Sequence, residues 1–476
     1  MVTPPTTFTA YMRLWCITNL LRISIGMNAG TGLVGSTLDR GAIFLPGLVL
    51  AAGVLPSRWS GALPAAALTV RALTNLAKGA MMSNSQMWAT QMDAALLVAL
   101  AAQRMTSTAS WRAPLTATDE RAVVGACART IRWQLAIFYF ASGWWKLNTS
   151  FLSVDYSCAS LFTVQPLEYL PDSVLFATEG IFGALVPMTA RLIATIAPAM
   201  TLVIEAVVPA LHFLEPTRWP VCARLGVGFT LVFHLIIGLT PPPSNVSTYG
   251  VTTCTRLFFV MPDALALAVA ELTAGSSKGY LLGASMAAAA AMSLALVAPL
   301  HAAAVSTVQG EGVDWHLGYY AMMCVLFGRA MLLEVSGAIA EKTMIVEGGV
   351  YKKLVGLACV YAFVLPMLGL QEKAGCLMFS QLRLHGGSNH VRRLGLDAPV
   401  PLGSPSIHSA PLPPHSLWIC LCVCGSSRAR VRSISCQPPC CRERSSTPHR
   451  ATASPAASCA SRRPTSSGWA TRSPST

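Results

Sequence analysis

The chain has 476 residues, of which 53% are hydrophobic and only 11% are charged. A soluble domain usually carries about 25% charged residues, so the composition argues against a water-soluble protein of this size. The net charge of +14 does not indicate nucleic-acid binding, because nine arginines and a single acid after residue 400 give the last segment a charge of +8 by itself.

Apolar runs recur along the chain and predict membrane-spanning helices. A bilayer crossing needs about 20 mostly apolar residues, and we count roughly nine to eleven such segments between residues 11 and 372. Strand-like alternation of apolar and polar residues is absent there, which favours bundled helices over a barrel. The predicted fold is therefore an all-α, polytopic membrane helix bundle. Its first predicted partner is the lipid bilayer, in an endomembrane or a plastid membrane.

Three regions differ in composition. Residues 1–372 form the predicted transmembrane domain, and residues 373–396 form an exit segment that contains the letters LHGGSNH. Residues 397–476 are rich in Pro, Ser, Arg and Cys. Such a tract buries too little apolar surface to offset the entropy of ordering it, so we expect disorder. The composition is also typical of a stretch translated in a wrong frame.

Basic residues predict the orientation of the bundle. The hydrophilic stretch before the span that begins at Ile131 contains Arg104, Arg112, Arg121, Arg129 and Arg132. The positive-inside rule places this stretch in the cytosol, and the following span then carries Lys146 to the opposite side. The first ten residues lack the features of a cleavable signal peptide, so we expect the first span to act as the targeting signal.

Ionisable residues within or next to the predicted spans are the candidate functional residues. A charge at the bilayer centre costs about 2.5–3.5 kcal/mol on insertion scales, so such side chains face partners or water. An interfacial, purely structural position is the alternative for each of them. The candidates are Lys78, Asp93, Lys146, Glu179, Glu205, His212, His234, Arg329 and Glu334.

Lys146 is the most informative of these residues. A helix-length apolar run ends on Trp144 and Trp145, directly before this lysine. The amine either snorkels to the membrane surface as an anchor or lies desolvated in an apolar niche, where loss of its proton would make it a base. A nearby carboxylate would oppose that loss, and the sequence offers no acid before Asp155.

The residues around Lys146 also resemble a known family. The block from Gln134 to Cys158 reads QLAIFYFASGWWKLNTSFLSVDYSC, and it resembles the HTTM-like (horizontally transferred transmembrane) family, which is related to the vitamin K-dependent gamma-carboxylase. Two further blocks are similar, Phe233–Gly238 and Met378–His390. The matching positions in the first block are Tyr139, Ala141, Gly143, Lys146, Leu147 and Asn148.

The resemblance implies an enzyme with Lys146 as the catalytic base and with a reduced, vitamin K-like quinone as cofactor. His234 and Glu205 are weaker candidates for the same cavity, and the expected partner is a lipid-phase small molecule. A transporter or channel whose path is lined by these polar residues is one alternative, and a non-catalytic membrane scaffold is another. No metal site is predicted, because His385 and His390 lack a third ligand nearby.

Overall fold

The computed structural model describes residues 6–28, 47, 61–77, 84–107, 111, 113–154, 157–240, 248–305, 315–339, 343 and 349–368. Within these ranges every regular element is a helix, which confirms the all-α class. All of these residues belong to one compact unit, Met1–Ser426. The predicted exit segment 373–396, the tail 397–476 and Lys78 lie outside the described residues.

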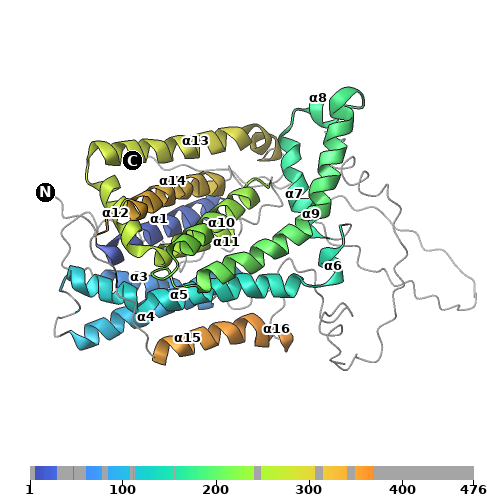
Figure 1. The fold of residues 1–476 in the computed structure, drawn as a ribbon. Helices are drawn as coiled ribbons and strands as arrows, with labels where there is room; N and C mark the ends of the chain where they lie inside the picture. The colour runs from blue at the N-terminus through green and yellow to red at the C-terminus, as the bar shows by residue number, and fades with distance from the viewer. Residues whose placement is uncertain are drawn as a thin grey trace, which may run out of the picture. The chain divides into compact units, whose positions relative to one another are not determined.

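The helices of this unit follow one another along the chain as drawn in Figure 1. The long ones are α1 (Thr7–Asn28), α3 (Ala62–Ala77), α4 (Asn84–Thr106), α5 (Ala117–Lys146), α9 (Gly180–Phe213), α10 (Pro220–Gly238), α12 (Pro262–Thr273), α13 (Ser277–Val305), α14 (Trp315–Val335) and α15 (Gly349–Cys359). The short ones are α6 (Thr149–Leu152), α7 (Cys158–Val164), η2 (Gln165–Tyr169), α8 (Asp172–Leu175), α11 (Thr248–Arg256), η3 (Leu257–Val260), η4 (Val360–Val364) and α16 (Leu365–Met367).

Five helical spans in the described part of the chain are long and apolar enough to cross a membrane. They are 180–213, 220–238, 277–297, 316–335 and 349–367, and a sixth arises if the bent pair 249–260 and 262–273 counts as one span. These helices support an integral membrane protein. The predicted number of nine to eleven is not confirmed: α3 has only 16 residues, and α1, α4 and α5 are not among the helices long and apolar enough to cross a membrane.

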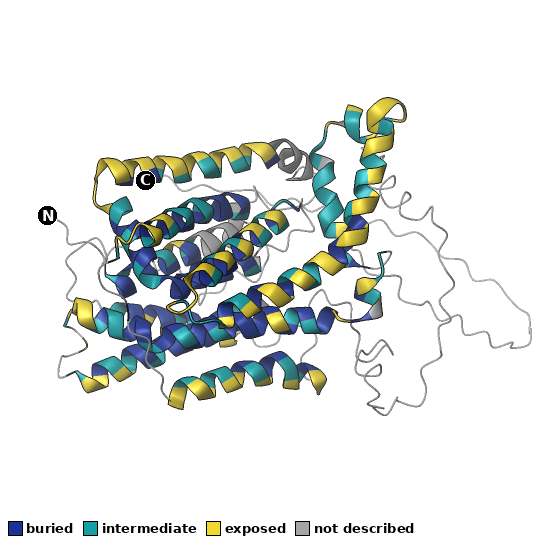
Figure 2. Cartoon of the chain, viewed as in Figure 1, coloured by how far each residue is buried: buried dark blue, intermediate teal, exposed yellow. Residues whose placement is uncertain are grey.

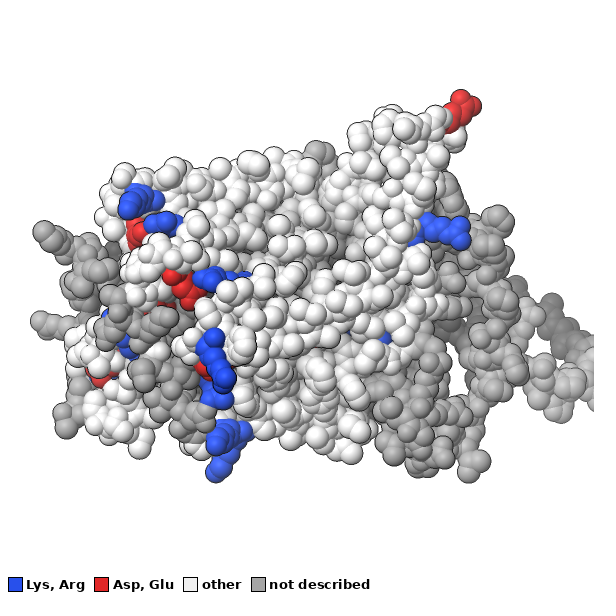
Figure 3. Space-filling view, viewed as in Figure 1, with Lys and Arg blue, Asp and Glu red and all other residues white. Residues whose placement is uncertain are grey.

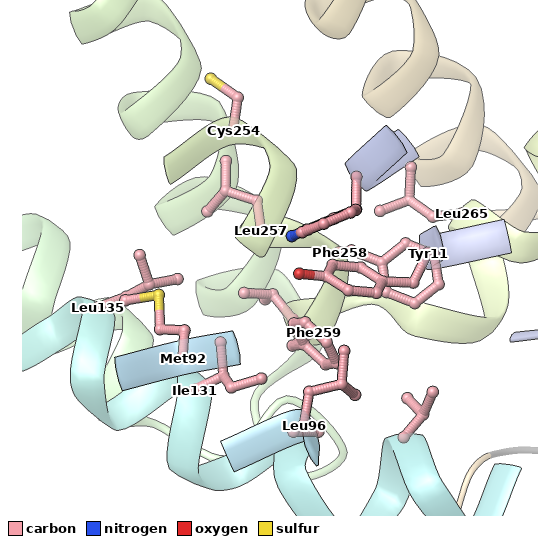
Figure 4. Close-up of a cluster of buried hydrophobic side chains, with 14 of the residues drawn as sticks. Tyr11, Met92, Leu96, Ile131, Leu135, Cys254, Leu257, Phe258, Phe259 and Leu265 are labelled. Carbon is pink, nitrogen blue, oxygen red and sulfur yellow. The ribbon is translucent and has the colours of Figure 1, made fainter. Parts of the chain in front are cut away.

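The core of the unit lies where α1, α4, α5 and η3 meet. Figure 4 shows Tyr11 from α1 beside Phe258 and Phe259 of η3, with Leu96 and Ile131 close by. The ring centroid of Tyr11 lies 5.5 Å from that of Phe258 and 4.6 Å from that of Phe259. Such tilted aromatic contacts add packing specificity to the burial of apolar area. The cluster fixes the position of η3, where the chain turns by 107° between α11 and α12.

The outer helices expose large apolar side chains. Tyr280, Leu281 and Met292 of α13 are 72%, 70% and 72% exposed, and Figure 2 shows exposed positions repeating along this helix. Apolar exposure over so much surface is unfavourable in water but matches the acyl chains of a bilayer. The molecular face in Figure 3 carries few charged side chains over its middle and gathers most of them towards one end.

Hydrogen bonds and ion pairs join polar groups of neighbouring helices, at the start of α5 and between α12 and α14. Glu120 accepts hydrogen bonds from the backbone nitrogen and the hydroxyl of Thr9, at 2.7 and 2.8 Å, and so satisfies a donor in the first turn of α1. Burial raises the pKa of this carboxyl. Arg329 pairs with Glu271 through two hydrogen bonds of 2.8 and 2.7 Å. Lys146 lies at the opposite end of α5, as the sequence predicts.

The N-terminus of α5 predicts a measurable stability effect. Thr116 and Asp119 form a capping box, and hydrogen bonding, first from the Thr116 side chain, lowers the pKa of Asp119. Thr116→Ala is expected to lower the free energy of unfolding by about 1 kcal/mol at neutral pH. Because the folded-state pKa of the acid is depressed, its contribution is complete above the unfolded value of about 3.9 and disappears as the pH falls through the folded one.

Melting of the purified protein, followed by tryptophan fluorescence, tests this prediction. Thr106→Ala is the matched control, because the hydroxyl of Thr106 is exposed and bonds only carbonyls of its own helix. A Thr116→Ala variant that melts together with this control at pH 7 would contradict the capping role.

Candidate functional site

Lys146 forms a buried ion pair with Glu205 of α9. Its side chain is 9% exposed, that of Glu205 is 5% exposed, and its ammonium nitrogen donates to Oε1 of the carboxylate. The local sequence offers no acid before Asp155, but the fold supplies one to the amine from another helix. The partner comes from 59 residues further along the chain, where a local reading of the sequence does not reach. The structure thus places a buried carboxylate directly against the amine.

Gly143 and the turn at Asn148 bring the side chains of Lys146 and Glu205 together. A Cβ atom on Gly143 would lie 3.1 Å from the Cβ of Glu205, so glycine at this position lets α9 approach α5 closely. Asn148 then ends α5 and begins α6: its amide donates to the carbonyl of Trp145 at 3.0 Å, and its side-chain oxygen accepts from the backbone nitrogen of Phe151 at 2.9 Å. The Lys-Leu-Asn letters thus place the lysine at a fixed helix end.

The surroundings of the pair are mostly apolar. The nitrogen of Lys146 lies 5.7 Å from the ring centroid of Phe151, and the thiol of Cys158 lies close enough to interact electrostatically with both charges. The second oxygen of Glu205, Oε2, is buried and has no hydrogen-bond partner within the described residues. Oε2 of this carboxylate is therefore available to accept a hydrogen bond from a further donor.

Exposed apolar side chains lie close in sequence to the pair on several helices. Phe140, Leu147, Leu152 and Leu161 are 46%, 49%, 46% and 56% exposed. Such side chains favour contact with acyl chains over contact with water. This end of the bundle therefore combines a buried ion pair with an apolar exterior.

His234 lies in a buried aromatic cluster behind the ion pair. Its Nε2 atom is 2.5 Å from the hydroxyl of Tyr139, and its ring centroid lies 5.4 Å from that of Tyr249 and 6.0 Å from that of Tyr320. Tyr139 precedes Lys146 by two turns of α5, which corresponds to about 10 Å. The structure therefore brings Lys146 and Glu205 into contact and connects His234 to the same helix without direct contact.

The other candidates divide into buried pairs and positions near helix ends. Asp93 is 1% exposed, accepts from Arg256 at 2.6 Å and from the indole nitrogen of Trp15 at 3.2 Å, and lies in the core. Glu179 is exposed beside the start of α9, and Glu334, near the end of α14, lies 3.9 Å from Arg224. The last two fit the structural alternative.

Sequence reasoning missed several buried polar residues. Arg132 was placed in the hydrophilic stretch before the span, yet it is 1% exposed and pairs with Glu215 at 3.1 Å. Arg256 ends a threonine-rich helix that is too polar to be recognised as part of a span. An unusual run of threonines, with Thr252, Thr253 and Thr255 all at most 2% exposed, was the available signal.

Among the described residues, no three His, Cys, Asp or Glu side chains lie close enough together to hold a metal ion. His385 and His390 lie outside these residues. The comparisons with known proteins found no matching family model, no similar curated protein and no similar solved structure.

Proposed function

We propose that this integral membrane protein is an enzyme that removes a proton from a hydroxyl group of a lipid-phase small molecule, with a reduced quinone as the substrate class. The observation that carries this proposal is the buried Lys146–Glu205 pair in apolar surroundings. The resemblance of the lysine block to the HTTM-like family supports the same substrate class.

The geometry gives the two residues different roles. Oε2 of Glu205 has no partner among the described residues and can accept the proton of a substrate hydroxyl. The ammonium of Lys146 then balances the negative charge that remains, which is worth most in a site with little water. This assignment moves the base from Lys146 to Glu205, because Oε2 of Glu205 has no partner among the described residues whereas the amine already donates to Oε1. The buried ring of Phe151 supplies an apolar, aromatic wall on the α6 side.

Oxidation of a reduced naphthoquinone by dissolved oxygen, which takes up the two electrons once the hydroxyl proton is removed, is measured with the protein in lipid nanodiscs and tests the proposal. Glu205→Gln and Lys146→Ala are each expected to lower turnover by roughly 100-fold or more, as loss of an acid–base group commonly does. Lys278→Ala is the control, because Lys278 is exposed at the start of α13, and it is expected to retain wild-type turnover. Equal turnover in the wild type and Glu205→Gln would refute the proposal.

A second candidate function, solute transport, is favoured by the break between α11 and α12. The two helices meet at 107°, and α11 buries Thr253, Thr255 and Arg256. Broken helices with buried polar groups are typical of transporter binding sites. Flux of a labelled solute into proteoliposomes that is lost in Arg256→Gln, with no quinone turnover in the wild type, would favour this candidate.

A further inference from the structure

Polar side chains follow one another along the interface of α5, α9 and α10. The side chains in question are buried or partly buried. From the Lys146 end onward they are Lys146, Glu205, Tyr139, His234, Thr230, His212, Arg132 and Glu215. We refer to these eight residues as the polar file.

The polar file extends over much of the thickness of a bilayer. α5 and α9 run antiparallel, since Lys146 pairs with Glu205 whereas Trp133 contacts Phe213, with 5.9 Å between ring centroids. From Lys146 to Arg132 there are 14 residues of one helix, or about 21 Å. The hydrocarbon core of a bilayer is about 30 Å thick. Measured along α5, the polar file is therefore about two thirds as long as that core is thick.

The first part of the file connects the ion pair to His234. Tyr139 precedes Gly143 by one turn of α5, and Gly143 faces Glu205. The charge of Glu205 accordingly acts on Tyr139. The hydroxyl of Tyr139 and Nε2 of His234 are 2.5 Å apart, which is a short hydrogen bond. A proton donor and a proton acceptor are thus in contact one turn from the carboxylate.

The second part runs from His234 to His212 through a hydroxyl. Thr230 precedes His234 by one turn of α10 and faces the same side. Its hydroxyl donates to the carbonyl of Gly226 at 2.7 Å and lies 3.1 Å from Nε2 of His212. With its only proton given to Gly226, the hydroxyl accepts from the imidazole, so the proton of neutral His212 is on Nε2. Nδ1 of His212 is then a free acceptor, and it has no partner in the described part of the chain.

The third part leads from His212 to the surface. Arg132 acts electrostatically on His212 and donates through Nη2 to Oε2 of Glu215 at 3.1 Å. Its Nε and Nη1, and Oε1 of Glu215, are buried and unpaired within the described residues. Arg129 adds a second cation beside Arg132. The side chain of Glu215 is 33% exposed, so this end of the file reaches solvent.

We propose that the polar file conducts protons between Glu215 and the Lys146–Glu205 pair. A proton from water binds Glu215 and moves to Nδ1 of His212, whose Nε2 proton passes to the hydroxyl of Thr230. That hydroxyl gives its own proton towards His234, and Tyr139 passes one on to Glu205. Every intermediate group ends with the number of protons it had, so the net event is transfer of one proton. The proposed path requires a bridging water between Glu215 and His212, between Thr230 and His234, and between Tyr139 and Glu205.

Proton flux into liposomes that contain a pH-sensitive dye measures this activity directly. The purified protein is reconstituted, a pH gradient is imposed, and potassium with valinomycin removes the opposing voltage. No quinone is present, so the measurement does not depend on the enzyme activity proposed above. We expect the wild type to carry protons about tenfold faster than protein-free liposomes, a rate ratio that corresponds to about 1.4 kcal/mol.

Matched substitutions test the path. Thr230→Val is expected to reduce the flux to the protein-free level, because it removes the hydroxyl and keeps the shape. Thr255→Val is its control, since Thr255 is an equally buried threonine outside the file. Glu215→Gln should have the same effect as Thr230→Val, and the exchange keeps the shape of the side chain and an oxygen that can accept from Arg132.

The outcomes separate this inference from the proposed function. A wild-type flux equal to that of protein-free liposomes, or equal fluxes in Thr230→Val and Thr255→Val, would overturn the proton path. If the wild type shows no proton flux but still oxidises the quinone, the proton path is refuted and the proposed enzyme activity is retained. Proton flux without quinone turnover would support the proton path and refute the proposed enzyme activity.

Discussion

Asp93→Ala is expected to lower the free energy of unfolding by about 3–5 kcal/mol, the cost of removing one partner of a buried ion pair. Asp93 is 1% exposed, and its carboxylate accepts from Arg256 at 2.6 Å and from Trp15 at 3.2 and 3.3 Å. Without it, the guanidinium of Arg256 remains in the core without a counter-charge, with Arg71 also close. The pair also joins α1, α4 and α11, so its loss affects three helices at once.

Thermal melting of purified protein, read by fluorescence-detected gel filtration, measures this loss. Asp119→Ala is the control, since Asp119 is a half-buried acid at the start of α5 whose removal costs about 1 kcal/mol. The double variant Asp93→Ala/Arg256→Met removes both charges and is expected to recover most of the stability. Asp93→Ala melting at the same temperature as Asp119→Ala would show that the core pair contributes no more than a surface cap.

Lys146→Met is expected to be equally destabilising, by about 3–5 kcal/mol, because Glu205 is then a buried carboxylate without its cation. The double variant Lys146→Met/Glu205→Leu replaces the pair with apolar side chains of similar volume, and such exchanges are often neutral or stabilising. We therefore expect the double variant to melt near the wild type. It is nevertheless expected to lack quinone turnover, since both proposed acid–base groups are gone.

A double-mutant cycle of melting temperatures and turnover rates measures both effects in one set of proteins. A coupling energy near zero between positions 146 and 205 would contradict the ion pair. A double variant that melts like the wild type and retains full turnover would contradict the proposed chemistry while leaving the pair itself in place.

The sequence predicts the class of the fold well, because composition and apolar runs act locally. It also predicts the end of α5 at Lys146, where the apolar run meets two tryptophans and a lysine. It does not predict the neighbours of that lysine. Glu205 is 59 residues away and His234 is 95 residues from Tyr139, so only the packing of α9 and α10 against α5 brings these groups together.

The same limit explains why the sequence does not place Arg132 and Arg256 in buried ion pairs. Arg132, Arg256 and Asp93 each lower the apolar character of the helix that carries them, although each is buried by pairing with an opposite charge. A sequence read for hydropathy treats such helices as polar, because pairing between distant residues leaves no local pattern. The threonines of α11 have a similar effect.

The exposed apolar side chains near Lys146 have a consequence for enzymology. A substrate that reaches the ion pair past Phe140 and Leu147 arrives sideways from the leaflet, where it is already concentrated by partition. Saturation of the enzyme then depends on the mole fraction of the substrate among the lipids and not on the molarity of the substrate in the assay. Adding inert phospholipid at constant substrate would slow such an enzyme by surface dilution alone.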